Sequence, residues 1–312
     1  MLEIIVPYFL GIDGGGTKTT CAVGDEACVL ATTTAGPSNI VRVGESQTRE
    51  SLQRCVRQAC AAAGISLEEV TRTCVGGSGA ARPDLAEIVR GMLAEILHSP
   101  IDVVGDMEIA LEAAFASGPG VIVIAGTGSI AYGRDGKGKS IRAGGWGFAI
   151  GDEGSAHWIG RAGVSAVLRA SDLQGETRRD EAASLGEDLC RKWGVTSLLD
   201  LARAANSIPP PDFAALFPAV EASKDELARQ VLRQAGRELA QVAELVIRRL
   251  FGEKESVVPV AMTGGVFRHS ELVRDVFYNE LRKLEARAEV NRQVIDPVEG
   301  ALRIARRGTP RN

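Results

Sequence analysis

The chain contains 312 residues, of which 45% are hydrophobic and 24% charged, and its net charge is −4 at neutral pH. This length favours two domains, each with an ordinary hydrophobic core. The lack of a basic stripe argues against a nucleic-acid partner, and no apolar segment is long enough to span a bilayer. The first apolar run lacks the basic start of a signal peptide. We therefore expect a cytoplasmic protein without a membrane partner.

Apolar runs separated by glycines and acidic turns predict three successive strands at the N-terminus, then helices that alternate with further strands. After a break at Ser117–Gly120 the same order begins again. The repetition predicts a duplicated α/β unit with a mixed sheet in each half. The expected strands are 4–13, 17–23, 27–33, 71–76, 101–104, 121–125, 130–133, 139–143 and 257–262, and the expected helical segments are 45–63, 83–97, 106–116, 155–251, 269–287 and 298–307.

Six cysteines are scattered along the chain, and none has the Cys-x-x-Cys spacing of a zinc or redox site. Most fall within expected strands or helices, where a thiol packs as a small hydrophobic group. We interpret them as buried, reduced thiols, which fits a reducing compartment. They are Cys21, Cys28, Cys55, Cys60, Cys74 and Cys190.

A glycine-rich turn, Gly11–Thr19, directly follows the first apolar strand and leads into a second strand. Glycines let backbone N–H groups approach an anion closely, and Thr17 and Lys18 add donors. Asp13 at the strand end is placed to hold water on a divalent cation. A Walker A loop or a Rossmann turn would lead into a helix instead. The pattern indicates a phosphate site on a hairpin, although a simple tight hairpin remains the alternative.

Two further glycine turns repeat this arrangement in the second half. Gly126–Ser129 lies between two expected strands, and Thr263–Val266 follows the strand 257–262. Three strand-then-glycine turns in one chain favour two halves that bind one polyphosphate, rather than three unrelated turns.

Taken in order, these motifs resemble the N-acetylglucosamine kinase and BadF/BadG/BcrA/BcrD-type ATPase family of the actin/hexokinase-like superfamily. The motifs are Asp-Gly-Gly-Gly-Thr, Gly-Asp, Gly-Thr-Gly-Ser, Gly-Gly-Trp-Gly followed by Gly-Asp-Glu-Gly-Ser, and Thr-Gly-Gly-Val. The resemblance covers residues 1–312. It implies a duplicated ribonuclease-H-like, two-lobed α/β fold with ATP and sugar in the interlobe cleft, and a homodimer. We expect one lobe from 1–117 and the C-terminal helix 298–312, and the other from 118–297.

The resemblance also implies a role for individual residues. Asp106 would be the catalytic carboxylate, and Asp13 would hold Mg²⁺ through the water shell of the metal. The phosphate and adenosine contacts of ATP would be Gly14, Gly15, Gly16, Thr17, Lys18, Thr127, Gly128, Ser129, Gly264 and Gly265. The sugar contacts would be Asn39, Ser78, Asp106, Gly145, Trp146 and Asp152.

The chemistry of Asp106 agrees with this role. Phosphoryl transfer needs a metal ion, donors aimed at phosphate oxygens and an aligned nucleophile. An aspartate is ionised at neutral pH and can accept the proton of a sugar hydroxyl. The alternative is that Asp106 only caps a helix.

Plain structural alternatives exist for three of the sugar contacts. Asn39 could simply hold a turn, and Asp152 with Glu153 could form a solvated turn. Trp146 lies among glycines, which supply little apolar surface, so stacking on a ligand or a lid role competes with core packing.

The leading functional interpretation is an ATP-dependent kinase of an amino sugar, with N-acetylglucosamine converted to its 6-phosphate. Position 130 is Ile, whereas the animal N-acetylglucosamine kinases hold a sugar-binding Asn there, so glucosamine or another hexose stays open. A second possibility is an ATPase activator of a 2-hydroxyacyl-CoA dehydratase. That class bridges its dimer with an iron–sulfur cluster, but only Cys190 lies beyond residue 120.

A third possibility is a sugar-sensing repressor. Repressors related to sugar kinases carry a helical DNA-binding module ahead of the nucleotide-binding strands. This sequence begins with those strands, so we expect no such module.

Overall fold

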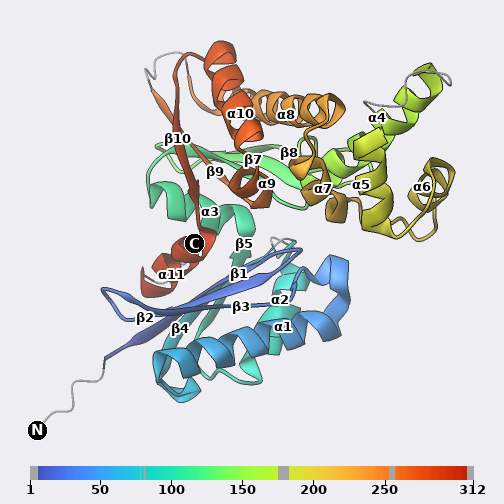
Figure 1. Cartoon of the computed structure of the whole chain (residues 1–312). Helices are drawn as coiled ribbons and strands as arrows, with labels where there is room; N and C mark the ends of the chain where they lie inside the picture. Colours follow the sequence, from blue (N-terminus) through green and yellow to red (C-terminus); the bar gives the residue numbers. More distant parts are fainter. Residues whose placement is uncertain (1–5, 78, 81, 175–182, 253–256, 308–312) are drawn as a thin grey trace, which may run out of the picture. The chain divides into compact units, whose positions relative to one another are not determined.

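The computed structural model describes residues 6–77, 79–80, 82–174, 183–252 and 257–307. The chain divides into two compact units, which are described separately. Unit 1 comprises residues 1–118 and 295–312, and unit 2 comprises residues 119–294 (Figure 1). Within the described residues, no helix is both long and apolar enough to cross a membrane.

Unit 1 is built on a five-stranded mixed sheet in the order β3-β2-β1-β4-β5. The first three strands are antiparallel neighbours, whereas β4 and β5 run parallel to β1. The elements of this unit are β1 (Tyr8–Gly14), β2 (Thr19–Gly24), β3 (Val29–Ala35), α1 (Ile40–Ala63), β4 (Val70–Gly77), α2 (Pro83–Ala94), β5 (Ile101–Gly105), α3 (Asp106–Phe115) and α11 (Pro297–Arg307), with a 3₁₀ turn at Leu67–Glu69.

Each face of this sheet has its own core, because side chains alternate across a strand. Leu10 and Ile12 of β1 pack with α1 and α2. Phe9 of the same strand packs on the other face with α3 and α11, where Leu302 is buried. The C-terminal helix therefore completes a unit that begins with the N-terminal strands.

Unit 2 has a second five-stranded sheet in the order β10-β9-β6-β7-β8. Its antiparallel β6–β7–β8 run and its parallel β6–β9 pair match unit 1. The elements are β6 (Gly120–Ala125), β7 (Ser129–Arg134), β8 (Ser140–Gly144), α4 (Ala156–Gln174), α5 (Ala183–Trp193), α6 (Leu198–Ala205), α7 (Phe217–Ala222), α8 (Glu226–Leu250), β9 (Val258–Thr263), α9 (Gly265–His269), α10 (Glu271–Leu284) and β10 (Ala288–Ile295), with a 3₁₀ turn at Phe213–Leu216.

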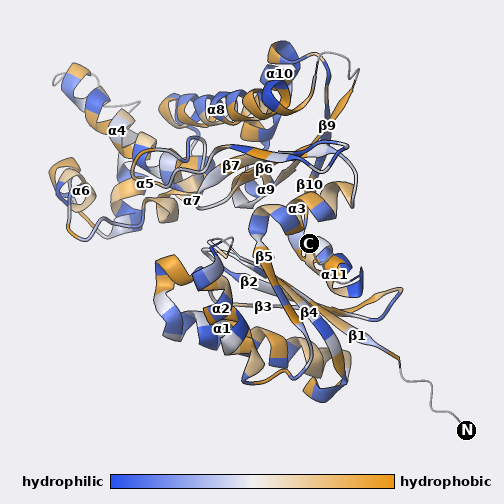
Figure 2. Ribbon diagram, turned by 180° about the vertical axis from the view of Figure 1, so that it is seen from behind, coloured by the Kyte–Doolittle hydropathy of each residue, from blue (hydrophilic) through white to orange (hydrophobic). Residues whose placement is uncertain are grey.

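The two sheets have the same strand order when one of them is taken from the opposite edge, so the predicted duplication of a mixed α/β unit is confirmed. The helix α8 shows how unit 2 is closed. Its hydrophobic and hydrophilic residues alternate along the ribbon (Figure 2), and Leu232, Leu239 and Val246 are buried in the core of the unit. These residues are seven apart, about two helical turns, and such spacing places one stripe of a helix against a sheet.

Two expectations were wrong. The helix expected over 269–287 ends at Leu284, and a strand, β10, follows it. The turn between them is held by Glu285, whose carboxylate binds the guanidinium of Arg287 at 2.9 Å. Cys28 precedes β3 and is exposed, whereas the other five cysteines are buried free thiols as expected.

Candidate functional site

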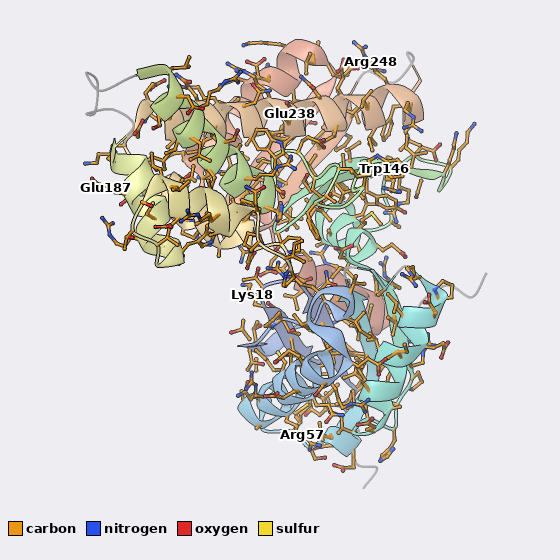
Figure 3. All side chains as sticks on the ribbon, turned by 90° about the vertical axis from the view of Figure 1, so that its right-hand side faces the viewer. Lys18, Arg57, Trp146, Glu187, Glu238 and Arg248 are labelled. Atoms are coloured by element: carbon orange, nitrogen blue, oxygen red, sulfur yellow. The ribbon has the colours of Figure 1, made fainter. Side chains whose placement is uncertain are left out.

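The first glycine turn closes the β1–β2 hairpin, with Gly14 opposite Thr19. Within the turn the N–H of Gly15 donates to the carbonyl of Lys18 at 3.0 Å. The carbonyl of Gly15 in turn accepts from Ser38 N–H at 3.1 Å. Because the oxygen of this carbonyl is hydrogen-bonded to Ser38, it does not repel an anion that binds to the outer side of the turn. Lys18 is exposed there (Figure 3).

The loop beneath this turn is fixed by buried polar contacts. The Thr19 hydroxyl lies 2.7 Å from both the carbonyl oxygen of Gly36 and the hydroxyl of Ser38. A Cβ on Gly14 would come within 2.9 Å of the Ser38 hydroxyl, so a larger residue at this position would displace that side chain. The side-chain oxygen of Asn39 accepts from Val41 N–H at 3.1 Å and caps α1. The structural role predicted as an alternative for Asn39 is therefore present.

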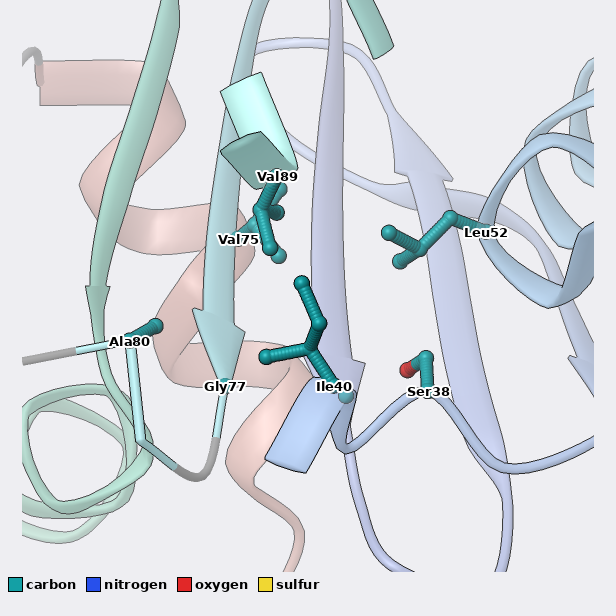
Figure 4. Close-up of a pocket in the computed structure, with 8 residues that line it drawn as sticks. Ser38, Ile40, Leu52, Val75, Gly77, Ala80 and Val89 are labelled. Atoms are coloured by element: carbon teal, nitrogen blue, oxygen red, sulfur yellow. The ribbon is translucent and has the colours of Figure 1, made fainter. Parts of the chain in front are cut away.

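A small cavity lies beside this loop and is lined mostly by apolar side chains (Figure 4). Its volume is about 10 Å³, close to the minimum that holds one water. A cavity of this size is far too small for a sugar or a nucleotide. The lining residues are Gly14, Ser38, Ile40, Leu52, Val75, Gly77, Ala80 and Val89.

Asp13 and Asp106 both stand at the carboxyl ends of parallel strands. Asp13 is level with Gly76 on β4 and through it with Val104 on β5. Since adjacent strands are about 4.8 Å apart, the β1 and β5 ends are separated by roughly 10 Å. Both aspartates are half-buried. Ser78, which was predicted to contact sugar, follows β4 but lies outside the described residues.

Asp106 is the first residue of α3, and Gly105 occupies the cap position. The interpretation of Asp106 as the N-cap residue is therefore wrong. Its carboxylate oxygen Oδ1 accepts from the N–H of Met107 at 2.9 Å. This hydrogen bond holds one carboxylate oxygen of Asp106 at the start of the helix.

The second glycine turn closes the β6–β7 hairpin of unit 2, with Ala125 opposite Ser129. The first N–H groups of α4 hold this turn from behind. Ala156 N–H donates to the carbonyl of Gly126 at 2.9 Å, and His157 N–H to that of Thr127 at 3.3 Å. The Ser129 hydroxyl is buried and donates to the carbonyl of Glu153 at 2.7 Å. The hydroxyl proton of Ser129 is therefore already used, and a contact of Ser129 with phosphate would need another of its atoms.

Asp152 is buried, with 8% of its surface exposed, so the alternative of a solvated turn is wrong. Its Oδ1 accepts from Gly147 N–H at 3.2 Å. A Cβ on Gly128 would lie 2.7 Å from its Oδ2. Burial raises the pKa of the Asp152 carboxyl, and the Gly147 hydrogen bond offsets part of that shift.

Trp146 is presented to solvent on the loop that leads to Asp152, with 69% of its surface exposed (Figure 3). The guanidinium of Arg142 lies 4.4 Å from the centre of its ring and donates to the carbonyls of Gly144 and Gly145 at 2.7 and 3.2 Å. A Cβ on Gly145 would come within 2.6 Å of Ile130. Core packing is thus excluded for Trp146, and Ile130 supports the loop from below.

The third glycine pair differs from the first two because it joins β9 to the helix α9 rather than to a strand. Gly264 has φ = 104°, and a Cβ there would lie 2.3 Å from the carbonyl of Ala125. It therefore packs against the end of β6, next to the second turn. Gly265 is exposed.

Each unit thus gathers one part of the predicted residue set. Unit 1 brings together Asp13, the first turn, Asn39 and Asp106, and unit 2 brings together the second turn, Gly145, Trp146, Asp152 and the Gly264–Gly265 pair. Among the described residues no cluster of three or more histidine, cysteine or acidic side chains could hold a metal. Reasoning from sequence missed the supporting residues Ser38 and Arg142. The one signal in the sequence was for Arg142, which lies on the strand just before the tryptophan loop.

Comparison with known proteins shows the family of the chain. A model of the BadF/BadG/BcrA/BcrD ATPase family matches residues 10–304, and the chain belongs to this family. The N-acetylmuramic acid/N-acetylglucosamine kinase of Clostridium acetobutylicum is 33% identical to it, with 96% of this chain and 98% of the relative aligned. The N-acetyl-D-glucosamine kinase of Dictyostelium discoideum is 31% identical, with 95% of this chain and 97% of the relative aligned.

Solved structures show the same fold. A protein of Chromobacterium violaceum, provisionally named an N-acetylglucosamine kinase, superposes with a TM-score of 0.75 at 24% identity, over 96% of this chain and 99% of its own. A ROK family glucokinase of Streptomyces griseus, solved with glucose and AMPPNP, superposes with a TM-score of 0.63 at 16% identity, over 96% of this chain and 100% of its own.

Proposed function

We propose that the protein is an ATP-dependent kinase that phosphorylates the 6-hydroxyl of N-acetylglucosamine. The observation that carries this proposal is the pair of glycine turns, each of which closes a hairpin. In each turn a backbone N–H from a later segment donates to a glycine carbonyl, from Ser38 to Gly15 and from Ala156 to Gly126. Two relatives that are named as kinases of N-acetylated amino sugars, at 31% and 33% identity, support it.

The roles of the residues follow from their positions. The two turns, with Thr17, Lys18 and Thr127, would donate to phosphate oxygens of ATP, and Gly264–Gly265 would border the adenosine. Bound Mg²⁺ supplies neutralisation of the phosphate charge. Asp13 suits it, because Mg²⁺ prefers oxygen ligands and keeps several of its waters, and a half-buried carboxylate at a strand end can hold such a water.

Asp106 would act as the general base. Its carboxylate accepts the proton of the attacking sugar hydroxyl as the oxygen bonds to the γ-phosphorus and the bond to the β-phosphate oxygen breaks, so that ADP leaves. Asn39, Ser78, Gly145, Trp146 and Asp152 would bind and orient the sugar. An exposed indole suits the apolar face of a pyranose ring, since aromatic side chains bury large area with little loss of conformational entropy.

The deciding experiment is ADP release with Mg-ATP over a panel of sugars. The panel contains N-acetylglucosamine, N-acetylmuramic acid, glucosamine, glucose and mannose. N-acetylmuramic acid is included because the 33% identical relative is named for both N-acetylated sugars. We expect the highest kcat/KM with N-acetylglucosamine and a 6-phosphate by ³¹P NMR. ATP hydrolysis that no sugar stimulates would overturn the proposal.

The activator of a dehydratase remains the competing function within the family. It requires cysteines that can bind a cluster between two copies. In unit 2 Cys190 is buried, and in unit 1 only Cys28 is exposed. The kinase therefore predicts a colourless protein, whereas a brown protein with bound iron would favour the activator.

We further propose that the protein works as a homodimer in the cytoplasm. The six free thiols suit a reducing compartment, and the homodimer rests on the resemblance to the family. Light scattering coupled to gel filtration tests the homodimer, because a monomeric mass at micromolar concentration would exclude it.

A further inference from the structure

One carboxylate in unit 2 joins two loops that the proposed function treats as separate. The Asp152 side chain accepts from Gly147 N–H in the tryptophan loop at 3.2 Å. Its other oxygen lies so close to Gly128 that a Cβ there would approach to 2.7 Å. The carboxylate therefore fills the space between the turn and the tryptophan loop.

The backbone of Asp152 is held in an unusual conformation, with φ = 59°. Left-handed backbone is uncommon for any residue except glycine and persists only where the surroundings impose it. Here the Asp152 carbonyl accepts from Ser155 N–H at 3.1 Å. This tight bend precedes α4, whose first N–H groups donate to the carbonyls of Gly126 and Thr127. Asp152 thus contacts the phosphate turn through its own side chain, and its backbone bend directs the start of α4 to the same turn.

From these contacts we infer that Asp152 is a positioning residue that holds the second phosphate turn in its anion-binding form before sugar arrives and fixes the tryptophan loop to that turn. The inference rests on the proposed function, in which the turn binds ATP. It assigns Asp152 an effect on the nucleotide, in addition to any contact with sugar.

A simple sugar contact and a positioning residue predict different results in the absence of sugar. Loss of a sugar contact raises the sugar KM and leaves nucleotide binding unchanged. Loss of the positioning carboxylate leaves the N–H of Gly147 without its acceptor and empties the space beside Gly128, so the turn and the loop separate. Nucleotide affinity then falls even when no sugar is present, and Trp146 changes its environment.

The first measurement is calorimetric titration of sugar-free protein with Mg-AMPPNP. We expect Asp152→Ala to weaken binding at least tenfold. Asp152→Asn should weaken it less, because an amide oxygen can still accept from the N–H of Gly147. Glu153→Gln is the matched control, since Glu153 contacts the turn through its backbone carbonyl, and it should bind as the wild type does.

The second measurement follows Trp146 by acrylamide quenching in a Trp158→Phe, Trp193→Phe background. Asp152→Ala should change the quenching constant at least twofold, and Glu153→Gln should leave it unchanged. If that background fails to fold, the calorimetric titration of the intact chain decides alone.

Sugar-free nucleotide affinity within twofold of the wild type in Asp152→Ala would overturn the inference and leave a plain sugar contact. Failure of the sugar-free wild type to bind Mg-AMPPNP would overturn it too, because the turn would not be preformed. Neither result touches the proposed function, which the sugar-dependent release of ADP decides separately.

Discussion

Asp106 and Asp13 lie at the ends of strands that flank β4, and we expect them to divide the work of phosphoryl transfer. Asp106→Asn keeps the size of the side chain and an acceptor for Met107 N–H, but it removes the base. We expect kcat to fall about 10²-fold or more, because a positioned base contributes ~10²–10⁴ in rate. The affinities for sugar and ATP should change far less. Steady-state kinetics with calorimetric sugar binding checks both quantities.

Asp13→Asn is the comparison that separates the two roles. It should raise the Mg²⁺ concentration needed for half-maximal rate without abolishing sugar binding. If Asp106→Asn instead keeps near-normal turnover, Asp106 only favours the start of α3, and the base would have to be sought at Asp152.

The buried carboxyl of Asp152 makes a separate prediction about pH. Burial raises its pKa in the folded protein above the unfolded value of about 3.9. The folded state then binds more protons between these two values, so this carboxyl lowers the free energy of unfolding as pH rises through that window. Below the window the carboxyl is protonated in both states and costs nothing.

Asp152→Asn should therefore match the wild type in stability near pH 3 and exceed it at pH 7. Each unit of raised pKa corresponds to about 1.4 kcal/mol. Urea unfolding at both pH values measures the difference, and Glu153→Gln serves as the control for the loss of a negative charge nearby. A variant that is less stable than the wild type at pH 7 would show that the lost hydrogen bonds outweigh the relief.

At single residues, the sequence predicts what depends on local position. Aspartates at the ends of apolar strands and glycines in hairpins are visible in the sequence. The burial of Asp152 was not predictable, because it depends on the second turn folding over it, 24 residues earlier in the chain. For Asn39 the sequence offered a turn as the alternative to a sugar contact, but not the cap role, because the helix was expected to begin at residue 45 and begins at Ile40.

At the scale of elements, both units use the same device. A hairpin turn is held by backbone N–H groups at or just before the start of the helix that follows the third strand. Ser38 plays this part ahead of α1, and Ala156 plays it at the start of α4. A helix start supplies N–H groups that lack intrahelical partners. Duplication thus reproduced the support of the phosphate turn together with the turn itself.

The packing of α11 on α3 depends on a close approach at Gly300. A Cβ there would lie 1.9 Å from the carbonyl oxygen of Ile109 and 2.6 Å from Ala113 N. Gly300→Ala must push the two helices apart, because backbone atoms cannot rotate away. We expect a loss of about 1–3 kcal/mol or more in the free energy of unfolding, typical of overpacking.

Gly91→Ala is the matched control in the same unit. Gly91 is an exposed residue of α2, and a Cβ there would have no neighbour within 4 Å. This change should stabilise by roughly 0.5–1 kcal/mol, since alanine is the better helix former. Urea unfolding of both variants tests the pair, and equal stability of the two would contradict the close approach at Gly300.

Several strands were predictable to within a few residues because they are apolar runs that end in glycine, as at Gly105 and Gly144. The strand β10 was not, because it is an edge strand with several exposed polar residues and follows a helix without a glycine or proline between them. Its pairing with β9 depends on the fold of unit 2 rather than on its own pattern.

At the scale of the whole molecule, the two units differ in how the chain builds them. Unit 2 is one continuous segment, and its core is formed entirely by its own residues. Unit 1 needs both ends of the chain, since α11 joins its sheet only after all of unit 2 has been made. Contacts between residues so distant in sequence carry a larger loop-closure cost, so we expect unit 2 to be the more autonomous of the two.

This difference predicts the behaviour of fragments. The segment 119–294 should fold alone and unfold cooperatively. The segment 1–118 should not, because one face of its sheet would lose α11. Burial of Val298 and Leu302 contributes roughly 3–6 kcal/mol at ~1.5–3 kcal/mol each, out of a total stability that is typically about 5–15 kcal/mol.

Arg306 adds to this loss, because it donates to the carbonyls of Asp25 and Cys28 at 2.7 and 2.8 Å and so ties α11 to the β2–β3 turn. Circular dichroism and thermal melting of both fragments provide the test, with a peptide of residues 295–312 added to 1–118. The peptide should restore a cooperative transition to that fragment. A cooperative transition of 1–118 without the peptide, near the melting temperature of the intact chain, would mean that α11 covers the sheet without being required for its folding.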